Sequence, residues 1–193
     1  MIKNVIFDMG NVLLDYNPLI PLTKFVDKEE DRAIIQKELF ESVEWVQMDL
    51  GELSREQAYE TIKARIPETL HKDLHDCIYH WQICMTALEG AKEFVTRVKE
   101  QGFGVYVLSN ASEVFYEYFP EFLPLEFFDG IVVSADVHMV KPDIKIYQFL
   151  LERYGLKAEE CLFIDDRVPN VIAAIASGMQ GVVFKGDFKE IKI

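Results

Sequence analysis

Cysteine is scarce in this sequence, and its positions argue against both a disulfide framework and a zinc site. The three cysteines are Cys77, Cys84 and Cys161, an odd number without a CxxC pair and without histidines at metal-binding spacing. Small domains that rely on disulfides are much richer in cysteine. We therefore expect all three to be reduced, apolar residues.

Positive charge and long apolar runs are also in short supply. Lys and Arg number 20 against 33 Asp and Glu, which gives a formal net charge of −13, and no basic cluster interrupts this balance. Such a chain repels the phosphates of nucleic acids and of anionic membranes. No apolar stretch approaches the roughly 20 residues that span a bilayer, and the opening MIKNVIFD lacks the features of a signal peptide. We expect a cytoplasmic protein that binds neither nucleic acid nor membrane.

Apolar residues are nevertheless abundant, at half of the 193 positions, which is enough for one sizeable core. Short apolar runs that end in polar residues alternate with helical patterns, such as the one from Ala91 to Val98 that Gly102 ends, and those at 146–150 and 169–177. This alternation predicts an α/β fold, a parallel sheet with helices on both faces. The predicted strands are 5–8 (VIFD), 105–110 (VYVLSN), 131–136 (IVVSAD), 161–166 (CLFIDD) and 181–184 (GVVF).

Residues 16–88 contain no strand-like run but several helix signals. Ser54 and Gln57 have the spacing of a capping box, and Pro67 ends the helix that follows. Two interpretations stay open: ordinary helices that cover the sheet, or a cap that closes over a site. The predicted units are a core of residues 1–15 and 89–193 and an all-helical insertion of residues 16–88.

Polar side chains follow the predicted strands at the points where these end. They are Asp8, then Ser109 with Asn110, then Asp165 with Asp166. Each alone is explained by a turn or a helix cap. The carboxyl ends of parallel strands meet at one edge of a sheet, however, and three carboxylates gathered there repel one another unless a cation lies among them. Oxygen ligands of this kind suit Mg²⁺.

Lys141 is a candidate to bind an anion at the same site. In the stretch HMVKPDIKIY it precedes Pro142 and stands at the start of a predicted helix, where backbone N–H groups also attract anions. A lysine by itself is more often a solvated surface residue. Only the acids expected nearby make this one a candidate.

Four motifs in order, FDMGNV, LSN, VKP and FIDD, resemble those of the haloacid dehalogenase (HAD) superfamily. The resemblance extends from Ile2 to about Phe184, implies a Rossmann-like core, and places the helical segment where that superfamily carries a small cap. A two-component receiver domain also has three acids and a lysine, but its acidic pair comes early in the chain, whereas here the pair comes last. The DxGNV opening and the SxDxxxxKPxxxIY stretch at 134–147 are similar to bacterial α-D-glucose-1-phosphate phosphatases.

The resemblance implies a Mg²⁺-dependent phosphatase in which Asp8 attacks phosphorus and forms an aspartyl-phosphate. Lys141 would be the second catalytic residue, because its charge counters that of the transferred group. The groups that would hold the phosphoryl oxygens are Ser109, Lys141 and the backbone N–H groups near Met9, Gly10 and Asn110.

The same resemblance implies a ligand set for the metal. Mg²⁺ would bind a carboxylate oxygen of Asp8, the backbone carbonyl of Gly10 and the acidic pair. We expect Asp166 to bind directly and Asp165 directly or through water. The metal would let a carboxylate approach an anionic phosphate that otherwise repels it.

Gly10 departs from the DxD opening usual in the family, whose second acid protonates the leaving group and later activates water. Three interpretations stay open. In the first, another group supplies the proton. In the second, the substrate has a less basic leaving oxygen, as a sugar 1-phosphate or an acyl phosphate has. In the third, the protein is a weakened enzyme that binds a phosphorylated ligand or a partner. The candidates for the replacement group are Asp15, Glu44, His75 and His80.

We expect the substrate to be a small phosphorylated metabolite, because the helical insertion is short. A same-fold dehalogenase is the less favoured alternative, since such enzymes need no divalent cation and the acidic pair argues against that chemistry. Trp45 and Trp81 are expected to belong to the hydrophobic core rather than to a surface that stacks on a sugar. No motif indicates the identity of the substrate or the oligomeric state.

Overall fold

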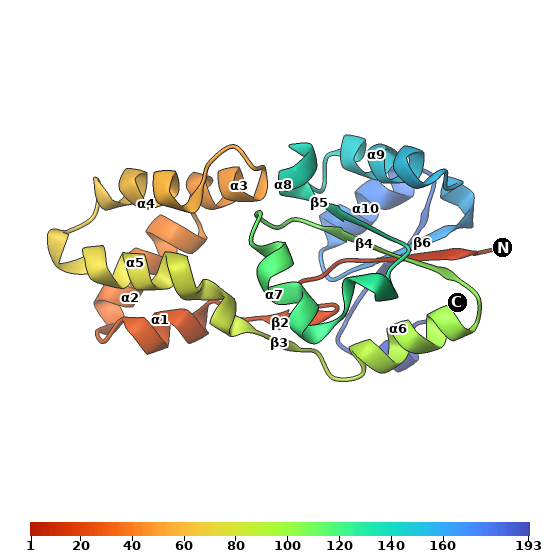
Figure 1. Ribbon diagram of the computed structural model, residues 1–193, viewed down its shortest axis with the longest axis horizontal. Coiled ribbons are helices and arrows are strands. Elements are labelled where there is room, and N and C mark those ends of the chain that lie inside the picture. Colours follow the sequence, from red (N-terminus) through yellow and green to blue (C-terminus); the bar gives the residue numbers. More distant parts are fainter.

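The computed structural model describes residues 1–193. Its central strands are β1 Asn4–Phe7, β4 Gly104–Ser109, β5 Gly130–Val133, β6 Cys161–Asp165 and β7 Gln180–Val183. They form one sheet in the order β5-β4-β1-β6-β7, and every pairing is parallel (Figure 1). All five predicted strands are present, so the α/β, Rossmann-like architecture is confirmed.

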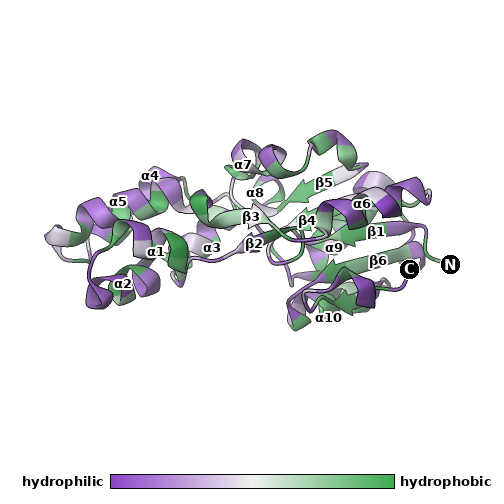
Figure 2. Ribbon diagram, turned by 90° about the horizontal axis from the view of Figure 1, so that it is seen from below, coloured by the Kyte–Doolittle hydropathy of each residue, from purple (hydrophilic) through white to green (hydrophobic).

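Alternate residues of β1 face opposite layers of helices. The helices of the core are α6 Ala91–Glu100, α7 Phe115–Phe122, α8 Ser134–Val137, α9 Ile144–Tyr154 and α10 Val168–Ala176. Phe7 packs in one hydrophobic cluster with Phe94 of α6, whereas Ile6 packs in another with Tyr147 of α9. Figure 2 shows β5 and β6 largely in the hydrophobic colour. Burial on both faces explains why these strands are continuous apolar runs.

Most helix boundaries follow the signals in the sequence. Gly155 adopts the left-handed conformation directly after α9, with φ 64°, and Gly102 does so shortly after α6, with φ 86°. α10 begins one residue before Pro169, which therefore lies in the first turn, where proline is favoured. One predicted strand is too long, because β5 ends at Val133 and Ser134 already begins α8.

A second group of helices lies beside the core, at the left of Figure 1. It consists of α1 Leu19–Phe25, α2 Glu29–Ile35, a π-helical turn Gln36–Phe40, α3 Val43–Asp49, α4 Arg55–Lys63 and α5 His71–His80. We call these helices the cap. They enclose a hydrophobic cluster of their own, drawn from residues 22–78. The capping box predicted at Ser54 and Gln57 is present at the start of α4. None of the helices, in cap or core, combines the length and apolarity that crossing a bilayer requires.

The insertion is not entirely helical, which corrects the expectation for residues 16–88. Met85–Ala87 forms strand β3, which pairs antiparallel with β2, Leu14–Tyr16. Strands of three residues are too short to display an alternating pattern, so no strand signal is visible in the sequence. This two-stranded ribbon carries the chain out of the core and back again. We propose that it joins two units, the core and the cap.

Candidate active site

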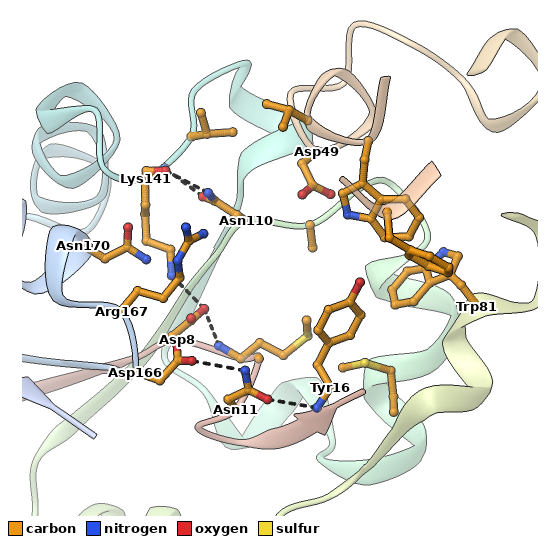
Figure 3. A pocket seen from close by; sticks show the side chains of 18 of the residues that line it. Asp8, Asn11, Tyr16, Asp49, Trp81, Asn110, Lys141, Asp166, Arg167 and Asn170 are labelled. Atoms are coloured by element: carbon orange, nitrogen blue, oxygen red, sulfur yellow. Dashed lines mark hydrogen bonds and ion pairs between the residues drawn. The ribbon is translucent and has the colours of Figure 1, made fainter. Parts of the chain in front are cut away.

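A cavity of about 410 Å³ lies at the carboxyl ends of the core strands, and both the core and the cap line it (Figure 3). The core contributes most of the polar groups, and the cap contributes Phe40, Trp45, Val46 and Asp49. Carboxyl ends of parallel strands are the usual ligand-binding edge of such a sheet. Of the residues predicted for the site, Asp8, Met9, Gly10, Asn110, Lys141 and Asp166 line the cavity, whereas Ser109 and Asp165 do not.

Lys141 lies between two buried carboxylates. Its Nζ is 2.7 Å from Asp8 Oδ1 and 2.8 Å from Asp165 Oδ2, and only 1% of its side chain is exposed. Burial raises the pKa of Asp8, Lys141 lowers it in part, and the charge of Asp165 raises it further, to about 7. A further cation beside Asp8 would favour its ionised, nucleophilic form.

The three acids of the site form a tight cluster. Asp8, Asp165 and Asp166 each offer a carboxylate oxygen within 4.8 Å of the others. Asp165 is fully engaged, because besides the lysine it accepts hydrogen bonds from the backbone N–H of Arg167 at 2.8 Å and from Asn170 Nδ2 at 3.0 Å to each oxygen. One lysine cannot balance three acids, so the cluster retains negative charge that a cation would neutralise.

The free oxygens of the site fit a hard divalent cation. Asp166 accepts one hydrogen bond, from Asn11 Nδ2 at 3.1 Å, and the Gly10 carbonyl accepts none within the chain. Asn11 is held in the left-handed conformation, φ 55°, and its Oδ1 accepts from the backbone N–H of Tyr16 at 3.1 Å. Carboxylate and carbonyl oxygens are the ligands that Mg²⁺ takes in proteins. The set that remains available is therefore Asp8, Gly10 and Asp166.

Unpaired donors lie next to the same acids. The backbone N–H groups of Gly10 and Asn110 border the cavity and donate no hydrogen bond within the chain. Ser109, fully buried at the end of β4, has an Oγ without any partner. Met9 differs from the expectation, since its N–H donates to Asp8 Oδ1 at 2.7 Å and is not free. The free N–H groups of Gly10 and Asn110 lie at the cavity, where an anion would satisfy them, and a buried hydroxyl without a partner, like that of Ser109, is rare.

Asn110 fixes the backbone of Lys141. Its Oδ1 accepts from Lys141 N at 2.8 Å, and its Nδ2 donates to Lys141 O at 2.9 Å. The expectation that Lys141 begins a helix is wrong, because α9 begins at Ile144 and the side chain of Asp143 caps it by accepting from Lys145 N at 3.0 Å. Lys141 therefore contributes through its ammonium group and not through a helix N-terminus.

Three polar residues of the site were not found from the sequence. Asn170 holds Asp165, and a signal for it existed, since it is the one polar side chain in the apolar helix VPNVIAAIA. Arg167 lines the cavity and forms no ion pair, and Asn11 holds Asp166. The last two look like ordinary turn residues in the sequence, so no pattern distinguishes them.

An aromatic wall lines the cavity opposite the acids, and we define it as Tyr16, Phe40, Trp45, Trp81 and Tyr118. Phe40 and Trp45 belong to the cap, Tyr16 and Trp81 lie where the chain passes between core and cap, and Tyr118 belongs to α7 of the core. The ring centroids of Trp45 and Trp81 are 5.4 Å apart, as are those of Trp81 and Tyr118. Both tryptophans were expected in the core. Trp81 is indeed buried and packs against core residues, but both indoles also line the cavity. The wall offers a bound molecule an apolar surface opposite the acids.

Asp49 is the acid of the cap that faces the cavity (Figure 3). It is the last residue of α3, four residues after Trp45, and residues at this spacing share one face of a helix. Burial raises the pKa of Asp49 to about 7. The sequence did not single it out, because an acid at the end of an exposed-looking helix has no distinguishing pattern.

The four residues considered as replacements for the missing acid lie elsewhere. None of Asp15, Glu44, His75 and His80 lines the cavity. Asp15 is exposed in β2. Glu44 is buried inside the cap, where both of its oxygens accept from Arg65, at 2.6 and 2.8 Å. That pairing lowers the pKa of Glu44 to about 2, so this group is a poor proton donor.

Comparison with known proteins identifies related sequences along nearly the whole chain. Residues 2–178 match the profile of a hydrolase family described as haloacid dehalogenase-like hydrolase. The sesquiterpene phosphatase astK of Aspergillus oryzae is 29% identical over 188 residues, which cover 93% of this chain and 88% of the relative. An (S)-2-haloacid dehalogenase of Pseudomonas putida is 23% identical and covers 90% of this chain and 80% of that protein.

Solved structures share the fold. The HAD family enzyme bt-2542 from Bacteroides thetaiotaomicron, determined in complex with magnesium and inorganic phosphate, superposes with a TM-score of 0.76. The match covers 97% of this chain and 98% of that one, at 20% sequence identity. At this identity the likeness establishes the shared architecture, cap included, and leaves the chemistry to be argued from the residues themselves.

Proposed function

The chain belongs to the haloacid dehalogenase-like hydrolases, and from this premise we propose that it is a magnesium-dependent phosphatase of small organic phosphate monoesters. The observation that carries the proposal is the position of Asp8. It is a buried carboxylate at the end of the central strand, beside a buried lysine and two further acids, and it borders a cavity. A nucleophile that must form a covalent phosphoryl intermediate needs these surroundings.

The reaction proceeds in two displacements at phosphorus. Asp8 attacks phosphorus, the bond to the leaving oxygen breaks, and the alcohol departs with a proton. Water then attacks the phosphorus of the aspartyl-phosphate, the bond to Asp8 breaks, and phosphate leaves. Lys141, 2.7 Å from the attacking carboxylate, counters negative charge in both steps.

The phosphoryl oxygens are held by Lys141, by the free N–H groups of Gly10 and Asn110 and by Ser109. The unpartnered Ser109 Oγ supports this assignment, because a phosphoryl oxygen would supply the hydrogen bond that it lacks. Arg167 is unpaired at the same cavity and adds positive charge. The N–H of Met9 is left out of the set, because it already orients Asp8.

Magnesium would be held by Asp8, the Gly10 carbonyl and Asp166, whose oxygens are available. Asp165 orients Lys141 and acts on the metal at most through water, because its oxygens are engaged. When bound, the ion neutralises part of the phosphate charge and so allows an anionic carboxylate to approach. The structurally similar bt-2542 was determined in complex with magnesium and inorganic phosphate, which supports the choice of ion.

The aromatic wall favours a substrate with an apolar alcohol part. Most of the surface opposite the acids is aromatic or aliphatic, and a cavity of about 410 Å³ admits a small organic molecule. The relative astK is named a sesquiterpene phosphatase, which agrees with such a surface. We therefore propose phosphate esters of isoprenoid-sized, apolar alcohols as the preferred substrate class.

A sugar 1-phosphate is the second candidate, and the absence of an acid at Gly10 favours it, because an anomeric leaving oxygen needs less protonation. Aromatic rings such as Trp45 also stack on sugars. A dehalogenase is the third. The similarity to a haloacid dehalogenase supports this candidate. Dehalogenation needs no divalent cation, however, and so does not account for the cluster of three acids.

Product release from a matched panel tests these alternatives, with phosphate measured for the two esters and halide for the 2-haloacid. Farnesyl phosphate, glucose 1-phosphate and a 2-haloacid are supplied with Mg²⁺ or with EDTA, to wild type and to Asp8→Asn. We expect phosphate from the esters only with Mg²⁺, none with Asp8→Asn, and a kcat/KM for farnesyl phosphate at least about 10-fold above that for the sugar ester, roughly the worth of one buried aromatic contact. No phosphate from any ester, or equal rates with EDTA, would refute the proposal.

A further inference from the structure

The absence of an acid at position 10 is not forced by the backbone. Gly10 has no left-handed conformation, and a Cβ built on it would meet no heavy atom within 4 Å. A side chain would therefore fit there. If the leaving oxygen is basic, another group must supply the proton that such a side chain would donate.

Asp49 is the one carboxyl group of the cap that reaches the cavity. Figure 3 shows it across the cavity from Asp8. Its carboxyl group forms no hydrogen bond and no ion pair within the chain, although its backbone is firmly held. A carboxyl group without a structural partner, aimed at the space where a leaving group would lie, is free to exchange a proton with it.

The backbone of Asp49 is tied to the phosphate side of the core. Ser134 Oγ, in α8, donates to Asp49 O at 2.5 Å and accepts from Ala111 N at 2.9 Å. Ala111 is the residue that follows Asn110 in the chain. His138 Nδ1 lies 2.8 Å from Leu50 O. The cap thus carries Asp49 to a fixed place relative to the loop that follows β4.

We propose that Asp49 is the general acid and base that replaces the acid missing at position 10, and this proposal rests on the proposed phosphatase function. The acid comes from the cap instead of from the loop after β1. Catalysis of proton transfer therefore depends on the cap being docked on the core.

The surroundings of Asp49 suit this role. Burial alone raises its pKa to about 7, so the group carries its proton in part at neutral pH. The charge of Asp49 acts on two phenols, Tyr16 from β2 and Tyr118 from α7, and burial raises the pKa of both, so both are neutral. No cation pairs with Asp49 that would hold it permanently ionised.

The proton balance closes over one turnover. As Asp8 attacks phosphorus and the bond to the leaving oxygen breaks, the Asp49 carboxyl gives its proton to that oxygen, which leaves as the alcohol. The Asp49 carboxylate then takes a proton from water as the water oxygen attacks the aspartyl-phosphate. Phosphate leaves, and the Asp8 carboxylate and the Asp49 carboxyl are both regenerated.

Leaving-group dependence distinguishes this role from a structural one. An alkyl phosphate such as farnesyl phosphate has a basic leaving oxygen that needs the proton, whereas nitrophenyl phosphate has a weakly basic one that does not. For Asp49→Asn we expect kcat/KM to fall roughly 10²- to 10⁴-fold with the alkyl ester and less than about 10-fold with the aryl ester. Asp15→Asn, at an exposed acid of β2, is the control and should change neither.

The second half of the cycle gives an independent readout. Without the base, Asp49→Asn should release about one equivalent of nitrophenolate in a burst and then turn over slowly, because the aspartyl-phosphate persists. Asp49→Glu should recover part of the alkyl ester activity. Equal losses for the two esters, or no loss for either, would overturn the role of Asp49. Wild type and Asp8→Asn are assayed in parallel, so a failure of the phosphatase proposal itself is seen separately.

Discussion

Position 10 is where the chemistry of this chain departs from its family at the scale of a single residue. The proton donor that a side chain at 10 would provide is assigned to Asp49, and the two positions should then be interchangeable in function. Gly10→Asp in the Asp49→Asn background is expected to restore kcat/KM on the alkyl ester by at least about 10-fold, because a carboxyl group fits in the open space at 10.

Gly10→Asn in the same background is the matched control, since it has the same size but cannot donate a carboxyl proton. Restoration by aspartate and not by asparagine would support the assignment. The same recovery with both, or with neither, would contradict it. The measurement is steady-state phosphate release from farnesyl phosphate at neutral pH.

For single residues, the prediction from sequence agrees with the structure where the residue lies at the carboxyl end of a predicted strand. Asp8, Asp165 and Asp166 lie together because parallel strands bring their carboxyl ends to one edge, and this can be read from apolar runs alone. Asp49 could not be found in the same way. Its place depends on how the cap packs on the core, through Ser134 and His138, and no local pattern reports such a contact.

At the scale of elements, the junction between α3 and α8 sets the position of Asp49. Gly51, two residues beyond it, has φ 69°, and a Cβ there would overlap the backbone oxygen of Ala135. Gly51→Ala should push the end of α3 away from α8. We expect kcat/KM for the alkyl ester to fall by about 10-fold or more, with kcat/KM for the aryl ester largely retained.

Gly155→Ala at the end of α9 is the control for this prediction. It introduces the same kind of backbone strain, at φ 64°, but its Cβ would contact nothing. Both variants should lose about 1 kcal/mol or more of stability, whereas only Gly51→Ala should lose activity selectively. If the two variants behave alike in the assay, the docking of α3 on α8 does not position the acid.

Ion pairs around Arg65 hold the helices of the cap together. Arg65 donates two hydrogen bonds to the Glu44 carboxylate, one to the Glu38 carboxylate at 2.6 Å and one to the Glu38 backbone oxygen at 3.0 Å. Arg65→Ala leaves Glu44 buried without a partner, which we expect to lower the free energy of unfolding by roughly 1 to 3 kcal/mol at pH 7. The lower part of this range applies, because Arg65 is 35% exposed and solvent screens the pair.

The pH dependence of this loss has a definite sign. The Arg65 hydrogen bonds lower the pKa of Glu44 to about 2 in the folded state, below its value in the unfolded chain. The stabilisation is therefore present above about pH 5 and is lost as the pH falls toward 2. Urea denaturation of wild type and Arg65→Ala should give curves that converge on acidification. Lys63→Ala, which removes an exposed pair with Glu60, should cost less than about 0.5 kcal/mol at any pH. A difference in the free energy of unfolding between wild type and Arg65→Ala that stays constant with pH would contradict this account.

Elements were predictable where they are long and strongly patterned. The five core strands and the helices ending at Gly102 and Gly155 follow from apolar runs and glycine stops. The ribbon of β2 and β3 was missed because three residues cannot show a period. The helix expected to begin at Lys141 begins at Ile144 instead, because the side chain of Asp143 accepts a hydrogen bond from the backbone at its N-terminus.

At the scale of the whole molecule, binding of a divalent cation should couple to stability. The folded chain gathers three carboxylates within 4.8 Å, and the unfolded chain does not. A cation that binds only the folded state stabilises it by about 2.7 kcal/mol at a hundred times its Kd. We expect Mg²⁺ to raise the Tm of wild type and of Asp15→Asn, but not of Asp166→Asn. An equal rise in all three would indicate binding elsewhere on this acidic protein.

At the same scale, the sequence shows a contrast between segments rich in strand signals and the helical segment of residues 16–88, and the division into core and cap that we propose rests on it. The cavity between them was not visible in the sequence, because it is formed by surfaces far apart in the chain. The aromatic wall illustrates the point: Trp45 and Trp81 read as core residues, and they do pack together, yet one side of each faces the cavity. Only the placement of the cap decides which apolar side chains a substrate would touch.

The central claim, that Asp8 is a nucleophile toward phosphorus, is tested most directly by trapping the intermediate. Wild type mixed with Mg²⁺ and nitrophenyl phosphate is quenched in acid within the first turnover, digested, and examined by mass spectrometry. The account predicts one phosphoryl group on the peptide that contains Asp8, absent from Asp8→Asn and from samples with EDTA. Rapid release of phosphate with no phosphorylated peptide at any quench time would contradict it.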